Sequence, residues 1–278
     1  MTTLTLTGLV AVGSFAAGLL GALTGLGGGM VIVPLLTLVF GVDIHYAIGA
    51  SLVSVIATSS GAAAAYVKEG FTNVRVGMLL EVATTIGALI GAYLAGILTT
   101  TVIAVVFGLV LLYSAYLSLR PREEHVVGGP PNRLATWLRL HSTYPTAHGL
   151  QPYEVQHVPV GFGLMGLAGV LSGLLGIGSG AVKVLAMDQA MRLPFKVSTT
   201  TSNFMIGVTA AASAGVYLHR GYIDPGLSMP VMLGVLMGAM VGARLLTGAK
   251  PRSLRLIFSA VLVFLAVEML YNGLTGRI

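Results

Sequence analysis

Two stretches of sequence decide the architecture of this 278-residue chain: GLLGALTGLGGGMVIV at 18–33 and GVLSGLLGIGSGAVKV at 169–184. Each is an apolar run that a cluster of small residues, mostly glycine, interrupts before the run resumes. The second stretch begins 151 positions after the first, and the same shift carries Ser51 onto Ser202 without a gap. Self-similarity in one fixed register is typical of internal repeats. The sequence therefore predicts two related halves.

The composition places both halves in a membrane. Of all residues, 55% are hydrophobic and 9% are charged, and the mean hydropathy is +0.92. An ordinary soluble domain carries about 25% charged residues. Each helical crossing needs about 20 apolar residues, so the chain has room for about eight full spans and one large loop. The apolar runs are too long for the strands of a β-barrel. We predict an all-α polytopic protein of the cytoplasmic (inner) membrane.

Each half divides into five apolar stretches, of which the second is short. They cover 5–24, 30–42, 45–67, 74–98 and 101–119, and again 159–175, 181–193, 196–218, 225–247 and 253–272. The second stretch of each half is only about half a span long. We expect a re-entrant or broken helix there, with re-entry and crossing both left open. The predicted units are a first membrane repeat at 1–120, a cytoplasmic connector at 121–157 and a second membrane repeat at 158–278.

The basic residues predict that the two repeats are inverted relative to each other. Lys and Arg in short loops mark the cytoplasmic side. Lys68 and Arg75 flank the loop after the third stretch, whereas Lys250 lies in the loop after the fourth stretch of the second half. We expect the connector and the Lys250 loop to be cytoplasmic, and the loop at 98–101 and both termini to be external. Part of the connector, NRLATWLRL, fits either a short amphipathic helix on the membrane surface or a plain solvated linker.

The glycine clusters are candidate anion sites. Glycines let the backbone bend where side chains would clash, and a helix that starts after such a bend presents unpaired N–H groups with partial positive charge. The clusters at 27–29 and 178–180 would bring two helix starts to one place from opposite sides of the membrane. The alternative is that these glycines only let helices pack closely, as we expect for Gly87 and Gly91.

A lysine follows the second cluster, about one helical turn into the short stretch. Lys183 would lie inside the membrane, where a charged side chain costs about 2.5 to 3.5 kcal/mol and is functional by default. It could bind an anion, or it could snorkel to the surface or pair with Asp188. The hydroxyl-rich run STTTSN at 198–203 and its counterpart Ser51 could donate to the same anion or cap a helix.

Two carboxylates also lie inside apolar stretches. Glu81 and Glu268 could each carry a transported proton, or each could make an ordinary hydrogen bond between helices. His45, His219 and Arg244 fall at the ends of predicted helices and carry little functional signal.

Several classes of function lack their sequence signals. The chain has no cysteine, which removes disulfides, thiolate metal sites and cysteine nucleophiles. The run GIGSG does not match the G-x-S-x-G nucleophile motif, and no nucleotide-binding G-x-x-x-x-G-K-[ST] loop occurs. The net charge of +6 is spread over helix ends rather than gathered into a nucleic-acid surface. We predict no enzyme activity, no metal, no cofactor and no nucleic-acid partner.

Three motifs resemble the TauE/SafE sulfite exporter family, also known as TSUP: GLLGALTGLGGGMVIVPLL, GLLGIGSGAVKV and KVSTTTSNFMIGVTAAASAGVY. The likeness runs from about Gly18 to Leu270, apart from the connector. It implies a membrane permease for sulfite, sulfoacetate or other sulfonates. It also implies that the signature positions of the family are Gly27, Gly28, Gly29, Gly178, Ser179, Gly180, Lys183, Ser202 and Asn203.

The sequence as a whole predicts a secondary transporter that moves sulfite or a small organosulfonate such as sulfoacetate by alternating access. A passive channel for small sulfur oxyanions and a membrane scaffold without flux are the alternatives. The expected partners are a small anionic sulfur-containing substrate and the lipid bilayer, and a homo-oligomer stays open. The predicted substrate-binding residues are Gly27, Gly28, Gly29, Ser51, Gly178, Ser179, Gly180, Lys183, Thr201, Ser202 and Asn203. The coupling candidates are Glu81 and Glu268.

Overall fold

The computed structural model describes residues 3–24, 29–68, 70–119, 133–146, 149–246 and 251–276, and helices dominate this part of the chain. The first half contains α1 (Thr3–Thr24), α2 (Gly29–Pro34), η1 (Leu35–Val39), α3 (Ile44–Lys68), α4 (Val74–Ala95) and α5 (Thr100–Leu119). The second half contains α7 (Val158–Leu175), α8 (Gly180–Leu185), η2 (Ala186–Ala190), α9 (Phe195–His219), α10 (Pro225–Leu246) and α11 (Pro251–Leu274). The segments η1 and η2 are π-helical turns that continue α2 and α8.

The helices of the two halves recur in one register. After a shift of 151 positions, α3 coincides with α9 at both ends, and α4 coincides with α10. The contacts interchange in the same way, because α1 packs on α10 while α7 packs on α4. The helices α3 and α5 pack on their own counterparts, α9 and α11. The order, the length and the pairing of the helices therefore repeat.

Glycines set the distance between the paired helices. A Cβ atom on Gly91 of α4 would overlap the carbonyl oxygen of Val170 on α7, and one on Gly238 of α10 would overlap that of Phe15 on α1. Small residues let helix backbones approach closely, which favours association where lipid provides no hydrophobic driving force. These glycines serve packing, as the sequence predicts for the Gly87 and Gly91 pair.

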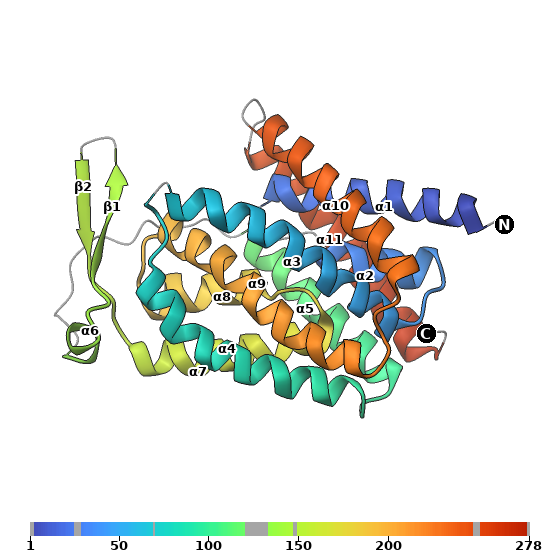
Figure 1. Cartoon of the computed structure of the whole chain (residues 1–278), viewed down its shortest axis with the longest axis horizontal. Helices are drawn as coiled ribbons and strands as arrows, with labels where there is room; N and C mark the ends of the chain where they lie inside the picture. Colours follow the sequence, from blue (N-terminus) through green and yellow to red (C-terminus); the bar gives the residue numbers. More distant parts are fainter. Residues whose placement is uncertain are drawn as a thin grey trace.

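Four of the described helices are long and apolar enough to cross a membrane, namely α4, α5, α7 and the Pro225–Gly242 part of α10. Shorter apolar helical segments cover Thr5–Gly21, Gly29–Val39, Ile44–Ser60 and Ser259–Leu274. The count of about eight full spans therefore stays a prediction. The long helices run broadly along the long axis of the molecule (Figure 1). Their exposed faces carry large apolar side chains, among them Met78 and Leu233, which suits contact with lipid tails.

The short segment after each glycine cluster spans about half a membrane. α2 with η1 covers 11 residues, and so does α8 with η2. At about 1.5 Å per residue each segment is about 16 Å long, against a hydrocarbon layer of about 30 Å. α2 packs on α3, and α8 packs on α9. Both short segments are thus held by the third helix of their own half.

The connector contains a β-hairpin, which the sequence analysis did not predict. After α6 (Arg133–Trp137), the strands β1 (Ser142–Thr146) and β2 (Gly149–Tyr153) pair in antiparallel register. Threonine and tyrosine favour strands, and a separation of two residues is the commonest length for a hairpin loop. These strand signals are weak beside the long apolar runs, because the connector is short and polar.

The connector docks on the start of α4 and is not a plain solvated linker. Asn73 caps α4 by accepting from the backbone N–H of Val76 at 3.1 Å. Its amide nitrogen donates to the carbonyl oxygen of Leu140 at 2.9 Å and to the hydroxyl of Tyr153 at 2.7 Å. Tyr153 is buried, and burial raises the pKa of its phenol to about 12. The hairpin lies at one end of the bundle, and the start of α1 lies at the other end (Figure 1).

Candidate functional site

The loop between α7 and α8 is built from left-handed residues. Gly176, Gly178 and Ser179 have φ angles of 66°, 70° and 45°. Glycine adopts this conformation without a steric penalty, whereas a residue with a side chain loses roughly 1–2 kcal/mol. Ser179 is therefore strained, and a β-branched residue at this position would be strained whatever space surrounds it.

The glycine breaks of the two halves meet beside Ser51 on α3. The Ser51 hydroxyl donates to the carbonyl oxygen of Gly176 at 2.8 Å. A Cβ atom on Gly29 would lie 3.0 Å from Ser51 Oγ and 3.2 Å from the Gly176 oxygen, so Gly29 lies against both. Gly27 and Gly28, which the sequence places in the same site, lie outside the described residues.

Hydroxyl groups of α9 hold the other side of the break. Ser202 donates to the carbonyl oxygen of Gly180 at 3.4 Å, and Tyr217 donates to that of Gly173 at 3.2 Å. Both hydroxyl-bearing residues are buried. Because α7 ends and α8 begins between these two carbonyl groups, α9 fixes both edges of the break.

Lys183 lies one turn beyond the break and has no exposed surface. Its Nζ donates to Thr209 Oγ1 on α9 at 2.6 Å, and the Thr209 hydroxyl donates to Glu81 Oε1 on α4 at 2.7 Å. We call Lys183, Thr209 and Glu81 the charge relay. Thr85 adds a second donor to Glu81 Oε1 at 3.2 Å. The relay joins the two halves, because Glu81 belongs to the first half and the other two residues belong to the second.

The charge relay lies near the middle of the helices that carry it. With about 1.5 Å of rise per residue, Glu81 lies about 5 Å from the midpoint of α4, and Thr209 lies about 3 Å from the midpoint of α9. A lone charge at such a depth is expensive, and an opposite charge connected through a hydrogen bond offsets much of that cost. The relay is therefore a compensated charge pair with a hydroxyl between its members.

Donors near the relay are sealed from solvent. Ser51, Ser179 and Lys183 each have 0% of their surface exposed. Within the described ranges, Ser179 Oγ has no hydrogen-bond partner, although a buried polar group without one costs about 1–3 kcal/mol. Hydroxyl and ammonium donors together suit an oxyanion, which accepts hydrogen bonds. In the described part of the chain, no group of three or more His, Asp or Glu side chains is placed so that it could hold a metal ion.

The family model described as "Sulfite exporter TauE/SafE" matches residues 10–269, nearly the whole chain. The chain belongs to the TauE/SafE family. It is a multi-pass membrane protein, as the sequence predicts.

Curated relatives of this TauE/SafE chain are named as membrane transporters. The probable membrane transporter protein YunE of Bacillus subtilis is 28% identical over 267 residues, which cover 93% of this chain and 95% of that protein. YdhB of the same organism is 27% identical over 231 residues, covering 83% and 86% of the two chains. The protein MJ0441 of Methanocaldococcus jannaschii is 23% identical over 276 residues, covering 94% of each. No solved structure matches the chain with statistical significance.

Some residues predicted for the site lie outside this cluster of donors. The Thr201 hydroxyl accepts from the backbone N–H of Asn73 at 3.0 Å, so it takes part in holding the start of α4. Asn203 is half-buried on α9, one position beyond Ser202. Glu268 accepts from the side chain of Asn272 on its own helix at 3.2 Å. Of the two coupling candidates, the structure brings only Glu81 to Lys183.

Sequence reasoning missed Thr209, the residue that connects the two charges. One signal was available, because Thr209 lies seven positions after Ser202 in an apolar stretch. Two helical turns separate such positions, so both fall on one face of a helix. A hydroxyl on the face that already carries Ser202 could have been assigned to the same site.

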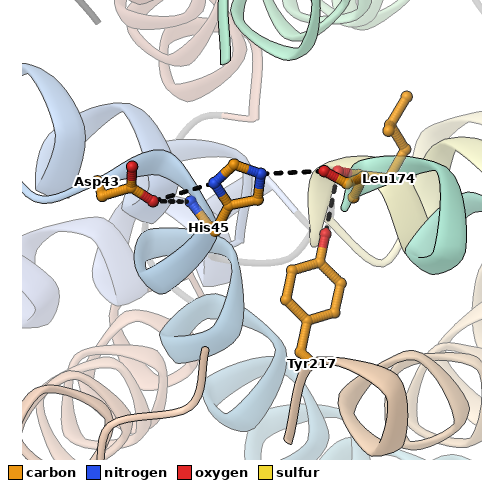
Figure 2. Close-up of polar contacts among 5 residues, drawn as sticks. Asp43, His45, Leu174 and Tyr217 are labelled. Atoms are coloured by element: carbon orange, nitrogen blue, oxygen red, sulfur yellow. Dashed lines mark hydrogen bonds and ion pairs between the residues drawn. The ribbon is translucent and has the colours of Figure 1, made fainter. Parts of the chain in front are cut away.

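A second polar cluster lies around His45, and Figure 2 shows its contacts. It lies at the opposite end of α4 from the connector. Asp43 Oδ1 accepts from the backbone N–H of His45 and lies 3.0 Å from its Nδ1, while Nε2 of the same ring lies 3.0 Å from the carbonyl oxygen of Ala95. The ring stacks on Tyr222 with 4.9 Å between centroids. We call the contacts of His45 with Asp43 and Ala95 the histidine clasp. It ties the start of α3 to the end of α4.

Proposed function

We propose that this chain is a secondary transporter that moves sulfite or a small organosulfonate, such as sulfoacetate, by alternating access. The observation that carries the proposal is the fully buried ammonium group of Lys183, beside a broken helix, in a member of a family described as sulfite exporters. A cation at this depth is costly and marks a substrate or ion pathway by default. Sulfite and sulfonates carry several oxygens that can accept from one ammonium and neighbouring hydroxyl groups.

The substrate would bind between the two glycine breaks. The donors available to it are the unpartnered Ser179 hydroxyl, the Lys183 ammonium, and the Ser51 and Ser202 hydroxyl groups, which now donate to backbone carbonyls. An oxyanion loses hydration when it enters the membrane, so the site must return hydrogen bonds to it. Gly29 and Gly178 would border the same site from opposite halves, because a Cβ atom on either one would lie 3.0–3.2 Å from the side chain of Val55 on α3.

Two inverted halves would provide the alternating access. The interchanged packing of α1 on α10 and α7 on α4 supports a two-fold relation between them. The connector and the start of α1 lie at opposite ends of the molecule, which fits five crossing elements per half (Figure 1). Inverted repeats with interrupted helices form substrate sites near the middle of the membrane. Since Lys183 is buried, substrate would reach it only after the halves move relative to each other.

Counterflow in proteoliposomes tests this function against its alternatives. Vesicles that contain the protein and unlabelled sulfoacetate should accumulate labelled sulfoacetate transiently, because a carrier exchanges substrate across the membrane. A passive channel would show flux without counterflow, and a scaffold would show no flux at all. Either result would exclude the carrier. Sulfite, sulfate, thiosulfate and taurine, tested as competitors, would define the substrate.

A further inference from the structure

Glu81 has an unequal pair of carboxyl oxygens. Oε1 accepts from the hydroxyl groups of Thr209 and Thr85, whereas Oε2 is buried and has no hydrogen-bond partner in the described part of the chain. The whole residue is 8% exposed. An ionised carboxylate can accept on both oxygens, and a protonated one carries a donor on one of them. Oε2 is therefore the oxygen at which a proton could bind without breaking an existing contact.

Charge balance links this oxygen to the substrate. With Lys183 protonated and Glu81 ionised, the relay carries no net charge. An anion that binds beside Lys183 adds a negative charge close to a carboxylate, and like charges in a buried site disfavour each other strongly. If Glu81 takes up a proton when a monoanion binds, the net charge of the site stays at zero. With a dianion, one negative charge is left. The hydroxyl of Thr209 would then donate to a neutral carboxyl group instead of a charged carboxylate.

Few other charged groups can fulfil this role. Of the helices packed on α4, α7 carries no ionisable side chain, and the charged residues of α9, Lys196 and His219, are exposed near its ends. On α4 itself Arg75 is exposed. The segment η2, which follows α8, carries the buried Asp188, which makes a contact of its own. Asp188 is therefore the carboxylate against which Glu81 must be tested.

We propose that binding of an anionic substrate at Lys183 is coupled to the uptake of one proton by Glu81, so that the anion and the proton cross the membrane together. This inference rests on the proposed function, because it needs an anion at Lys183. Lys183 binds the anion and Glu81 binds the proton on Oε2. Thr209 contacts both side chains and so keeps them close to each other. A monoanion then crosses without net charge, and a dianion crosses with one negative charge.

The test counts protons taken up by the purified full-length protein when sulfoacetate binds. Calorimetry at one pH in two buffers with different ionisation enthalpies gives this number. We expect about one proton per anion for the parent and for Asp188→Asn, and none with the binding that Glu81→Gln retains. Anion binding without proton uptake in the parent would overturn the coupling and leave the proposed function intact. Uptake that persists in Glu81→Gln would also overturn it.

A second measurement needs no variant, which matters because Glu81→Gln leaves Lys183 without its counter-charge. Sulfoacetate is fully ionised throughout the neutral range, so its own titration does not interfere. Uptake of one proton predicts that its Kd rises about tenfold for each pH unit once Glu81 is ionised in the free protein. A Kd that does not change with pH would contradict the proposal. If sulfoacetate and sulfite both failed to bind the parent at any pH, the proposed function would fail and the coupling with it.

Discussion

The two halves of the chain share a backbone plan but place different residues at its centre. The counterpart of Lys183 at a shift of 151 positions is Ile32, and that of Glu81 is Met232. Thr209 has a matching Thr58, and each hydroxyl contacts the carbonyl oxygen four positions earlier on its own helix at 3.0 Å. Thr209 also contacts both charged side chains, whereas the other contact of Thr58 is with the carbonyl oxygen of Val55. The frame is therefore repeated while the charge relay occurs once.

This difference separates two kinds of residue. The residues that set helix packing recur in both halves, whereas the charged residues of the relay do not. The glycines that set helix distances recur in both halves, because close packing has the same requirement on both sides. A second buried charge pair would add cost without need if one anion crosses at a time. Replacing a residue with the one that the other half carries at the same place should separate the two roles.

The largest effect is expected for Lys183→Ile, the residue at the counterpart position in the first half. It leaves Glu81 buried without a counter-charge, so we expect a loss of about 3–5 kcal/mol in stability together with loss of sulfoacetate binding. The double variant Lys183→Ile with Glu81→Met should recover most of the stability but no binding. Thermal unfolding and calorimetry measure the two effects. A double variant as unstable as the single one would mean that the relay is not a compensated pair.

The next effect concerns the connector, which docks on one half only. The counterpart of Asn73 is Asp224, which caps α10 by accepting from Gly226 N–H at 3.1 Å. Asn73→Asp keeps the cap but loses the amide donor, so the buried carbonyl oxygen of Leu140 loses its partner. We expect the hairpin to loosen by about 1–3 kcal/mol. Hydrogen exchange over 142–153 reports the change, and Asp224→Asn is the matched control that should leave the hairpin protected.

High pH should also detach the hairpin from the start of α4, because the phenol of Tyr153 loses its proton. Its pKa rises on burial from 10.0 to about 12, so the neutral phenol is favoured in the docked hairpin. The stability that this burial contributes is full below pH 10.0 and is lost as the pH rises through about 12. Hydrogen exchange is too fast to follow at such pH, so the change in tyrosine absorbance reports it. A Tyr153→Phe variant should lack this transition; its persistence in the variant would assign it to another tyrosine.

A smaller effect is expected for Ser179→Gly, which gives the second break the glycine that the first half carries at the matching position, Gly28. Glycine relieves the left-handed strain and adds backbone entropy to the unfolded chain, so stability should stay within about 1 kcal/mol of the parent. Loss of the hydroxyl should weaken sulfoacetate binding by about 0.5–1.5 kcal/mol. Unchanged affinity would remove Ser179 from the set of donors. Ser179→Val is less informative, because its strain would obscure any effect on binding.

The smallest effect concerns the two ends of the bundle, where a basic residue lies against an aromatic ring in each half. His45 stacks on Tyr222, and at the counterpart positions Lys196 lies 5.2 Å from the ring centroid of Phe71. The two ring nitrogens of His45 contact Asp43 Oδ1 and the carbonyl oxygen of Ala95, each at 3.0 Å. A lysine at this position has a single polar end and cannot make both contacts, so His45→Lys should loosen the start of α3 from the end of α4 by less than about 1 kcal/mol, because Asp43 is half exposed. Hydrogen exchange at the end of α4 measures this loss. Unchanged protection in His45→Lys would mean that the histidine clasp does not tie the two helices together.

Local features of the sequence were enough to predict the frame. Spacing and composition predict the repeat, the glycine breaks and the short segments, and neither requires knowledge of tertiary contacts. Lys183 stood out for the same reason, since one charge in an apolar stretch needs an explanation wherever the stretch packs. The hairpin was missed because its signal is a few alternating residues in a short polar segment.

Only the tertiary structure decided which groups meet. Sequence offered Asp188, five positions away, as a partner for Lys183, and it weighed Glu81 and Glu268 equally. The fold instead connects Lys183 through Thr209 to Glu81, a carboxylate 128 positions from that threonine. It likewise places Asn73 against the connector, 80 positions from Tyr153. Periodicity determines which residues share a helix face, but the packing of α4 against α7 and α9 determines which faces touch, and that packing depends on every helix at once.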